Sequence, residues 1–167
     1  MSDSTNICLS CGLCCDGSLI GHVQLGKDEI SDTRITMEIE EENGNGFFLQ
    51  PCQKYCDGCT VYSKRPQQCR SFDCGLLKSV KQLDVEFDTA LEIINIVKQK
   101  KSTIEKKLVT LPEEFRSKSF YFKMVELKKI LESNISNASH NEAEKTLESE
   151  LKELNHIVIK EFDVALN

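Results

Sequence analysis

The sequence has no tryptophan, only three prolines, and no cysteine in its second half. It also lacks any run of the roughly 20 apolar residues that a membrane-spanning helix needs. The first residues have neither the basic start nor the apolar core of a secretory signal peptide. These absences argue against a membrane protein or a secreted one, and they predict a cytoplasmic location.

Basic charge is scarce as well. The 167 residues carry 21 Lys and Arg against 27 Asp and Glu, which gives a net charge of -6 and a pI near 5.2. A protein dedicated to nucleic acid usually has a basic patch and a high pI, and anionic membranes attract basic segments. We therefore expect neither a nucleic acid nor a membrane among the partners.

Cysteine, in contrast, is abundant near the N-terminus. The nine residues are Cys8, Cys11, Cys14, Cys15, Cys52, Cys56, Cys59, Cys69 and Cys74. In a reducing cytoplasm such a cluster indicates metal binding or thiol chemistry rather than a disulfide framework. The odd number is a second argument against a closed set of disulfides. The composition therefore predicts that metal ions are bound through thiolates.

The spacing of the cysteines bears on the number of metals. Two-residue spacers between Cys8, Cys11 and Cys14 allow successive thiolates to converge on one centre. The side chains of the adjacent Cys14 and Cys15 diverge, so either they serve two metals, or one is a ligand and the other a neighbour. Neither cysteine segment alone supplies a regular four-ligand site, but the two segments together offer more than four thiolates.

The type of metal stays open at this stage. Zinc favours a tetrahedral set of four Cys or His ligands, and iron–sulfur clusters also take four cysteines. The pattern Cys-x2-Cys-x2-Cys opens a bacterial ferredoxin run, which then continues with a cysteine and a proline. This sequence has Ser18 and Leu19 at those places, so a fourth ligand must come from elsewhere.

Between the two cysteine segments, residues 18–50 predict short strands. Leu19–Leu25 is rich in apolar and β-branched residues, and Ile35–Ile39 alternates apolar with polar. Phe47–Leu49 follows a strong turn signal at Asn43–Gly46 and is expected to be the return strand of a hairpin. The glutamates before that turn are interpreted as a solvated strand end.

The remaining sequence predicts about three amphipathic helices. The first runs from Phe87 to Leu108, the second begins with the capping signature Thr110–Glu113, and the third begins with Ser139–Glu142. The apolar stripe of the third helix is interpreted as core, with a partner interface as the alternative. It consists of Leu147, Leu151, Leu154, Val158 and Phe162.

These elements predict an α+β fold class with two parts. Residues 1–75 form a small cysteine-rich module of strands and loops that is stapled by metal. Residues 76–167 form a helical region that packs on the module or serves as an interaction arm for a protein partner.

The two cysteine segments form one extended pattern. It runs Cys8-x2-Cys11-x2-Cys14-Cys15, Pro51-Cys52, Cys59-x2-Tyr62-x2-Arg65-Pro66-x2-Cys69-Arg70 and Cys74. This pattern resembles the YkgJ-type cysteine-cluster family, which carries a CxxCxxCC motif and is described as a zinc- or iron-chelating domain. The resemblance implies eight metal ligands, namely Cys8, Cys11, Cys14, Cys15, Cys52, Cys59, Cys69 and Cys74. Cys56 has no counterpart in the family pattern.

Three functions are compatible with this resemblance. The first is a metal-chelating module, binding zinc or an iron–sulfur cluster, with a structural or metal-delivery role. The second is an iron–sulfur redox or radical-type enzyme, since the flagellin lysine N-methylases have a similar cysteine pattern and an iron–sulfur centre. Methyl transfer is not implied, because the chain is short and has no Gly-rich nucleotide loop. The third is a thiol sensor that releases zinc when it is oxidised. No catalytic residue is predicted.

Arg65 and Arg70 are predicted to support the metal. Four thiolates around one zinc ion carry a net charge of about −2, which is costly to bury without compensation. A guanidinium neutralises such charge and donates several hydrogen bonds at once. The alternative is that both arginines pair with surface carboxylates such as Asp57 or Asp73. His22 is interpreted as a histidine on a strand surface rather than a ligand.

Overall fold

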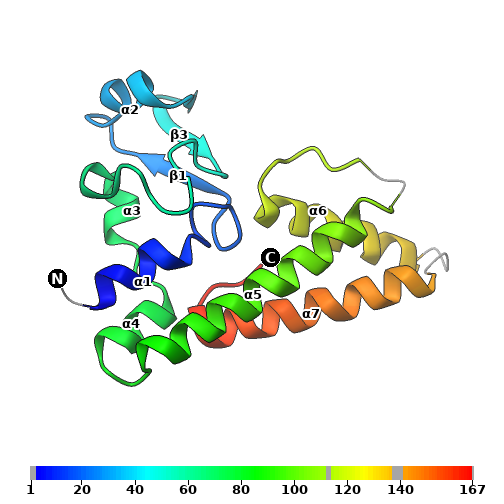
Figure 1. The fold of residues 1–167 in the computed structure, drawn as a ribbon. Helices are drawn as coiled ribbons and strands as arrows, with labels where there is room; N and C mark the ends of the chain where they lie inside the picture. Colours follow the sequence, from blue (N-terminus) through cyan, green and yellow to red (C-terminus); the bar gives the residue numbers. More distant parts are fainter. Residues whose placement is uncertain (1–2, 112–113, 137–140, 167) are drawn as a thin grey trace.

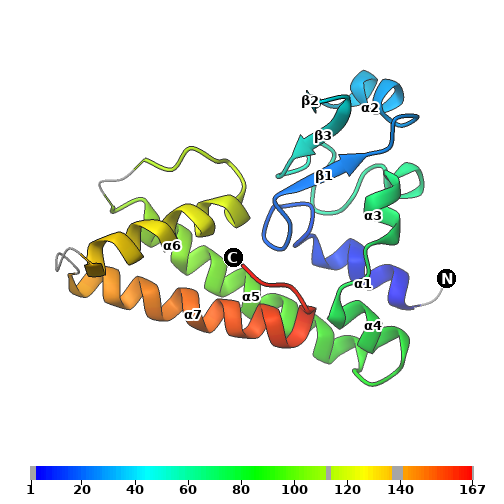
Figure 2. The same cartoon turned by 180° about the vertical axis from the view of Figure 1, so that it is seen from behind.

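The fold combines a small antiparallel sheet with helices, as Figures 1 and 2 show from opposite sides. A computed structural model describes residues 3–111, 114–136 and 141–166. Within these ranges the helices are α1 Asp3–Cys11, α2 Ile30–Thr36, α3 Gln67–Ser71, α4 Gly75–Lys81, α5 Phe87–Leu108, α6 Phe120–Ser136 and α7 Glu142–Phe162. The strands are β1 His22–Leu25, β2 Glu40–Glu42 and β3 Asn45–Leu49. The α+β class predicted from the sequence is confirmed.

The sheet has the order β1-β3-β2, and both pairings are antiparallel. In β1, His22 pairs with Leu49 of β3. Between β2 and β3, Asn43 and Gly44 both have positive φ, 53° and 76°, as a two-residue type I′ hairpin turn requires. The predicted turn is therefore confirmed. The three residues of β2 are glutamates exposed to solvent, which agrees with the interpretation of a solvated strand.

The predicted strand at Ile35–Ile39 is wrong, because α2 extends through Thr36 and β2 begins only at Glu40. A turn starts the helix: Gly26 accepts a hydrogen bond from the backbone of Glu29, whose side chain accepts one from Gly26 in return. Ile35 is 82% exposed, so the alternation in the sequence does not mark a buried face. A pattern of five residues is too short to separate a strand from the end of a helix.

The apolar stripe of α7 is core, as predicted, since all five of its residues are buried. The helix starts with a capping box in which the side chain of Asn141 accepts from Glu144 and the Glu144 side chain accepts in return. The cap is thus Asn141; Ser139 and His140 of the predicted signature lie outside the described residues.

The predicted start of the second helix at Thr110–Glu113 is wrong. Thr110 ends the turn after α5, where its hydroxyl donates to the carbonyl of Lys107. Pro112 and Glu113 lie outside the described residues, and α6 begins at Phe120 after a non-helical stretch. The local capping signature therefore coincides with a helix end rather than a helix start.

Two apolar clusters hold these elements together. The large one joins α4, α5, α6 and α7 with Ile7, Leu13 and Leu19 from the N-terminal part. The small one lies at the sheet and consists of Val23, Leu25, Met37 and Phe48. In Figures 1 and 2, α1 lies between the sheet and α5, so the cysteine-bearing segments are placed between the two clusters.

No helix in the described part of the chain is long and apolar enough to cross a membrane.

Candidate metal centre

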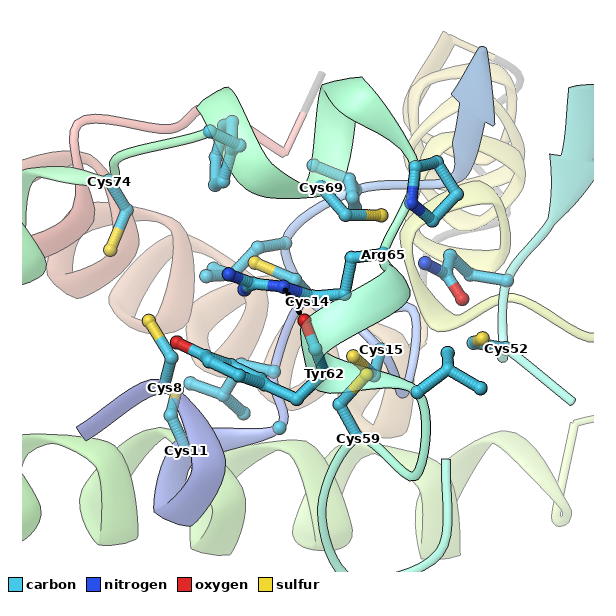
Figure 3. Close-up of a pocket in the computed structure, with 18 of the residues that line it drawn as sticks. Cys8, Cys11, Cys14, Cys15, Cys52, Cys59, Tyr62, Arg65, Cys69 and Cys74 are labelled. Atoms are coloured by element: carbon cyan, nitrogen blue, oxygen red, sulfur yellow. Dashed lines mark hydrogen bonds between the residues drawn. The ribbon is translucent and has the colours of Figure 1, made fainter. Parts of the chain in front are cut away.

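One cavity brings together all eight cysteines of the extended pattern, as Figure 3 shows. Its volume is about 100 Å³, well below the roughly 300–1,000 Å³ typical of pockets for organic ligands. Cys56 is exposed and does not line this cavity. None of the nine cysteines is part of a disulfide.

Helix α1, the turn after it and the start of α4 position four of these cysteines. Cys8 and Cys11 lie three residues apart on α1 and therefore on one face of that helix. Gly12 ends the helix with a φ of 69°, the left-handed conformation that is usual just after a helix, and the chain then turns to Cys14. Cys74 is the N-cap of α4, and its Sγ accepts a hydrogen bond of 3.5 Å from the backbone N–H of Leu77.

The other four cysteines come from the loops beside the sheet and from α3. The backbone N–H of Cys52 donates to the carbonyl of Cys15 at 2.8 Å, which joins the two cysteine segments directly. Cys59 follows a tight turn and forms an isolated β-bridge with Tyr55. Cys69 lies on α3, whose Gln68 side chain accepts a hydrogen bond from the backbone of Gln24 in β1.

The surroundings divide the eight cysteines into two sets. Cys8, Cys11, Cys14 and Cys74 pack against the large core and form what we call the helix-side set. Cys52 and Cys69 pack against the small core at the sheet. We group Cys15 and Cys59 with them as the sheet-side set, because the charges of Cys59 and Cys52 act most strongly on Cys15. In Figure 3, Cys8, Cys11 and Cys74 lie on the left, Cys14 lies near the middle, and the sheet-side cysteines lie from the centre to the right.

The electrostatic neighbours of the adjacent Cys14 and Cys15 follow the same division. Burial raises the pKa of the Cys14 thiol most, and the largest further contributions come from the charges of Cys11 and Cys74, ahead of that of Cys15. Burial also raises the pKa of Cys15, to about 12, and here the neighbouring charges are those of Cys59 and Cys52. The two residues therefore belong to different sets although they are neighbours in the sequence.

Burial also raises the pKa of further thiols in both sets. It raises the pKa of Cys11 to about 12 and that of Cys69 to about 11. A bound cation reverses this tendency, because it favours the thiolate over the thiol. Each set thus offers four sulfur donors in apolar surroundings, which is the donor chemistry of a structural zinc ion or an iron–sulfur cluster.

The sulfurs surround the cavity without being gathered at one point. Among the described residues, no three His, Cys, Asp or Glu side chains are close enough to hold a metal ion in their present rotamers. Metal binding at either set therefore requires the sulfurs to come closer to a common centre than they lie here.

Arg65 and Arg70, the two arginines predicted to support the metal, lie in different surroundings. Arg65 lines the cavity; its guanidinium carbon lies 3.6 Å from the centre of the Tyr62 ring, and its Nε donates to the Tyr62 carbonyl at 2.9 Å. Arg70 is exposed, donates to the side chain of Gln67 and lines only an outer pocket beside the cavity. Asp73 pairs instead with Lys81, at 2.7 Å.

Two further residues of the cavity were missed by sequence reasoning. Tyr62 lies in the extended pattern, and its position three residues before Arg65 was a usable signal, since a turn of that length stacks the two side chains. Gln50 is 3% exposed, and its Oε1 has no hydrogen-bond partner among the described residues. Only its position before Pro51 distinguishes it in the sequence. His22 is on the exposed face of β1, stacked on Phe122, and does not line the cavity.

A comparison with known protein families identifies the family of this chain. Residues 7–107 match the CxxCxxCC family, described as "Putative zinc- or iron-chelating domain". The chain belongs to this family. The match extends past the last cysteine through α4 and almost to the end of α5, so the family unit includes the helices that pack against α1. No curated protein and no solved structure matches the chain.

Gly12 provides a test of how tightly the first cysteine segment is built. A Cβ atom at this position would lie 2.5 Å from the hydroxyl oxygen of Tyr55 and would also require a non-glycine residue at positive φ. We expect Gly12→Ala to lower the free energy of unfolding by about 2–4 kcal/mol, from backbone strain plus overpacking. Urea titration of the metal-loaded protein measures this loss.

The matched control is Gly44→Ala. Gly44 has a similar φ of 76°, but a Cβ atom there would have nothing within 4 Å. Its substitution should therefore cost only the strain of the left-handed backbone, about 1–2 kcal/mol. Equal losses for the two variants would show that the contact between Gly12 and Tyr55 contributes nothing.

Proposed function

We propose that the protein binds two metal centres, one in each set of four cysteines. The helix-side centre would use Cys8, Cys11, Cys14 and Cys74, and the sheet-side centre would use Cys15, Cys52, Cys59 and Cys69. The observation that carries this proposal is that one cavity is lined by eight cysteines, of which four pack against the large core and two against the small core at the sheet. Membership of a zinc- or iron-chelating family supports it.

The role that we propose is structural or in metal delivery, with zinc in both centres. Four thiolates fill the coordination sphere of zinc, and closed sites of this kind are structural, whereas catalytic zinc keeps one position open. The small volume of the cavity also argues against an organic substrate between the centres. We propose a reducing cytoplasm as the setting, because the nine cysteines are free thiols.

Iron is the second candidate, because each set also meets the four-cysteine requirement of an iron–sulfur cluster. The chemistry supplied would then be electron transfer. Tyr62 and Arg65 would lie beside the clusters, and hydrogen bonds and charge near the sulfurs adjust the reduction potential of such a cluster. Protein purified without air distinguishes the candidates, since an iron–sulfur protein is brown and a zinc protein is colourless.

Metal stoichiometry tests the two-centre proposal. We expect two zinc ions per chain after native purification, or iron with matching acid-labile sulfide, by elemental analysis. Cys11→Ser and Cys59→Ser should each lose the metal of one centre and keep that of the other, because each variant removes a ligand from only one set. The double variant should lose both.

Cys56→Ser is the matched control, because Cys56 is exposed and lies outside both sets. This variant should retain the full metal content. A single centre in the unsubstituted protein, or the loss of all metal in each single variant, would contradict two separate centres.

A further inference from the structure

One positively charged side chain lies where the two cysteine sets meet. In Figure 3, Arg65 extends between Cys8 and Cys74 on one side and Cys52 and Cys59 on the other. It lines both the cavity and the outer pocket that opens beside it, and that outer pocket is bordered by Cys8 of the helix-side set and Cys69 of the sheet-side set. Arg65 therefore has access to sulfurs of both sets.

The protein holds this guanidinium in place through its own backbone. Pro66 follows Arg65, and the two residues lie between the 3-10 turn Tyr62–Lys64 and α3, which carries Cys69. The Tyr62 ring lies under the Arg65 guanidinium, and the Tyr62 carbonyl accepts a hydrogen bond from Nε of Arg65. Tyr62 therefore fixes the orientation of the guanidinium plane and holds its Nε edge. A guanidinium has five N–H donors, and the bond to Tyr62 uses only one of them.

No carboxylate in the described part of the chain pairs with Arg65. The positive charge thus lines the same cavity as the eight sulfurs, and the carboxylate of the outer pocket, Asp73, pairs with Lys81 instead.

We propose that Arg65 is a positioning residue shared by the two centres, whose charge and hydrogen bonds stabilise both sets of metal-bound thiolates at once. This inference rests on the two-centre proposal above. Each four-thiolate zinc centre carries a charge of about −2, and two such centres in one cavity repel each other. A cation between them lowers the cost of both, and removing a side chain that supports a metal site commonly lowers metal affinity about 10–100-fold.

The test measures both metal affinities of the full chain by competition with a chromophoric zinc chelator. Arg65→Gln is expected to weaken both zinc equivalents about 10–100-fold while the helical circular dichroism stays unchanged. Arg65→Lys should recover part of the loss at both centres, because it keeps the charge but not the planar group that stacks on Tyr62. If the Arg65 side chain were only structural, Arg65→Lys would not recover zinc affinity relative to Arg65→Gln.

Lys64→Gln is the matched control, because it removes one positive charge from the neighbouring residue, which is exposed and does not line the cavity. It should leave both affinities within a factor of two or three. Weakening of only one centre by Arg65→Gln would overturn the sharing, and unchanged affinities would overturn any role at the metals. An unsubstituted protein that holds fewer than two zinc ions would instead contradict the two-centre proposal itself.

Discussion

Removal of the metal is expected to unfold the sheet and cysteine loops while most of the helical structure remains. The cluster at the sheet has only four buried apolar residues, Val23, Leu25, Met37 and Phe48. Units this small usually need a cross-link, and a structural zinc ion contributes about 10–16 kcal/mol of apparent folding free energy in small zinc-binding peptides. Helices α5 and α7, in contrast, pack their own apolar faces against each other.

The experiment follows two signals during titration with a strong chelator. Far-ultraviolet circular dichroism reports the helices, and limited proteolysis reports the cysteine loops. We expect new cleavage sites between residues 18 and 75 with little loss of helical signal. The same chelator saturated with zinc is the control, since it should produce neither change.

The N-terminal part and the helices share the large apolar cluster, so the helices could also lose structure when the metal is removed. Ile7, Leu13 and Leu19 lie in the large cluster together with the helices, so α1 couples the cysteine segment to the bundle. If helical signal disappeared together with the metal in one transition, the two parts would form a single cooperative unit. The division near residue 75, which remains a proposal, would then be wrong.

The sequence predicted that cysteines bind metal, but it could not predict which cysteines lie together in the folded chain. The two-residue spacers and the adjacent Cys14 and Cys15 were sufficient to suggest two centres. The partner of Cys14 could not be inferred, because Cys74 is brought near it only by the packing of α4 against α1. Likewise, Cys15 is joined to Cys52 by a backbone hydrogen bond across a long loop. Contacts of this kind depend on the folded chain and leave no local pattern.

The errors in secondary structure have a similar origin. Asn43 and Gly44 were recognised because a tight turn needs residues that tolerate positive φ, which is a local requirement. Ile35, in contrast, is an exposed apolar residue, so its position in an alternating pattern was misleading. Helix α1 in the N-terminal cysteine segment was not predicted either, although its Ile7 is buried in the large core.

Phe162→Ala is expected to cause the largest loss of stability of any single substitution proposed for the helical region. Phe162 ends α7 and is fully buried, with an exposed fraction of 0%. Replacing a buried phenylalanine with alanine removes its transfer free energy and leaves a cavity, at a cost of about 3–5 kcal/mol. Urea unfolding of the zinc-saturated protein, followed by circular dichroism, measures this loss.

Ile159→Ala is the matched control on the same helix. Ile159 is 49% exposed, so its truncation should cost less than about 1 kcal/mol. Similar losses for the two variants would mean that the end of α7 is not packed as the structure indicates.

The position of Phe162 extends this prediction to the metal. A Cβ atom at Gly75 would lie 3.1 Å from the backbone of Phe162, so the first residue of α4 rests directly on the end of α7. Cys74, the N-cap of α4, is the only helix-side cysteine that does not come from the first cysteine segment. Loosening the end of α7 should therefore weaken the zinc ion of the helix-side centre more than that of the sheet-side centre. Equal weakening of both zinc ions in Phe162→Ala would show that the bundle supports the whole cavity rather than this one ligand.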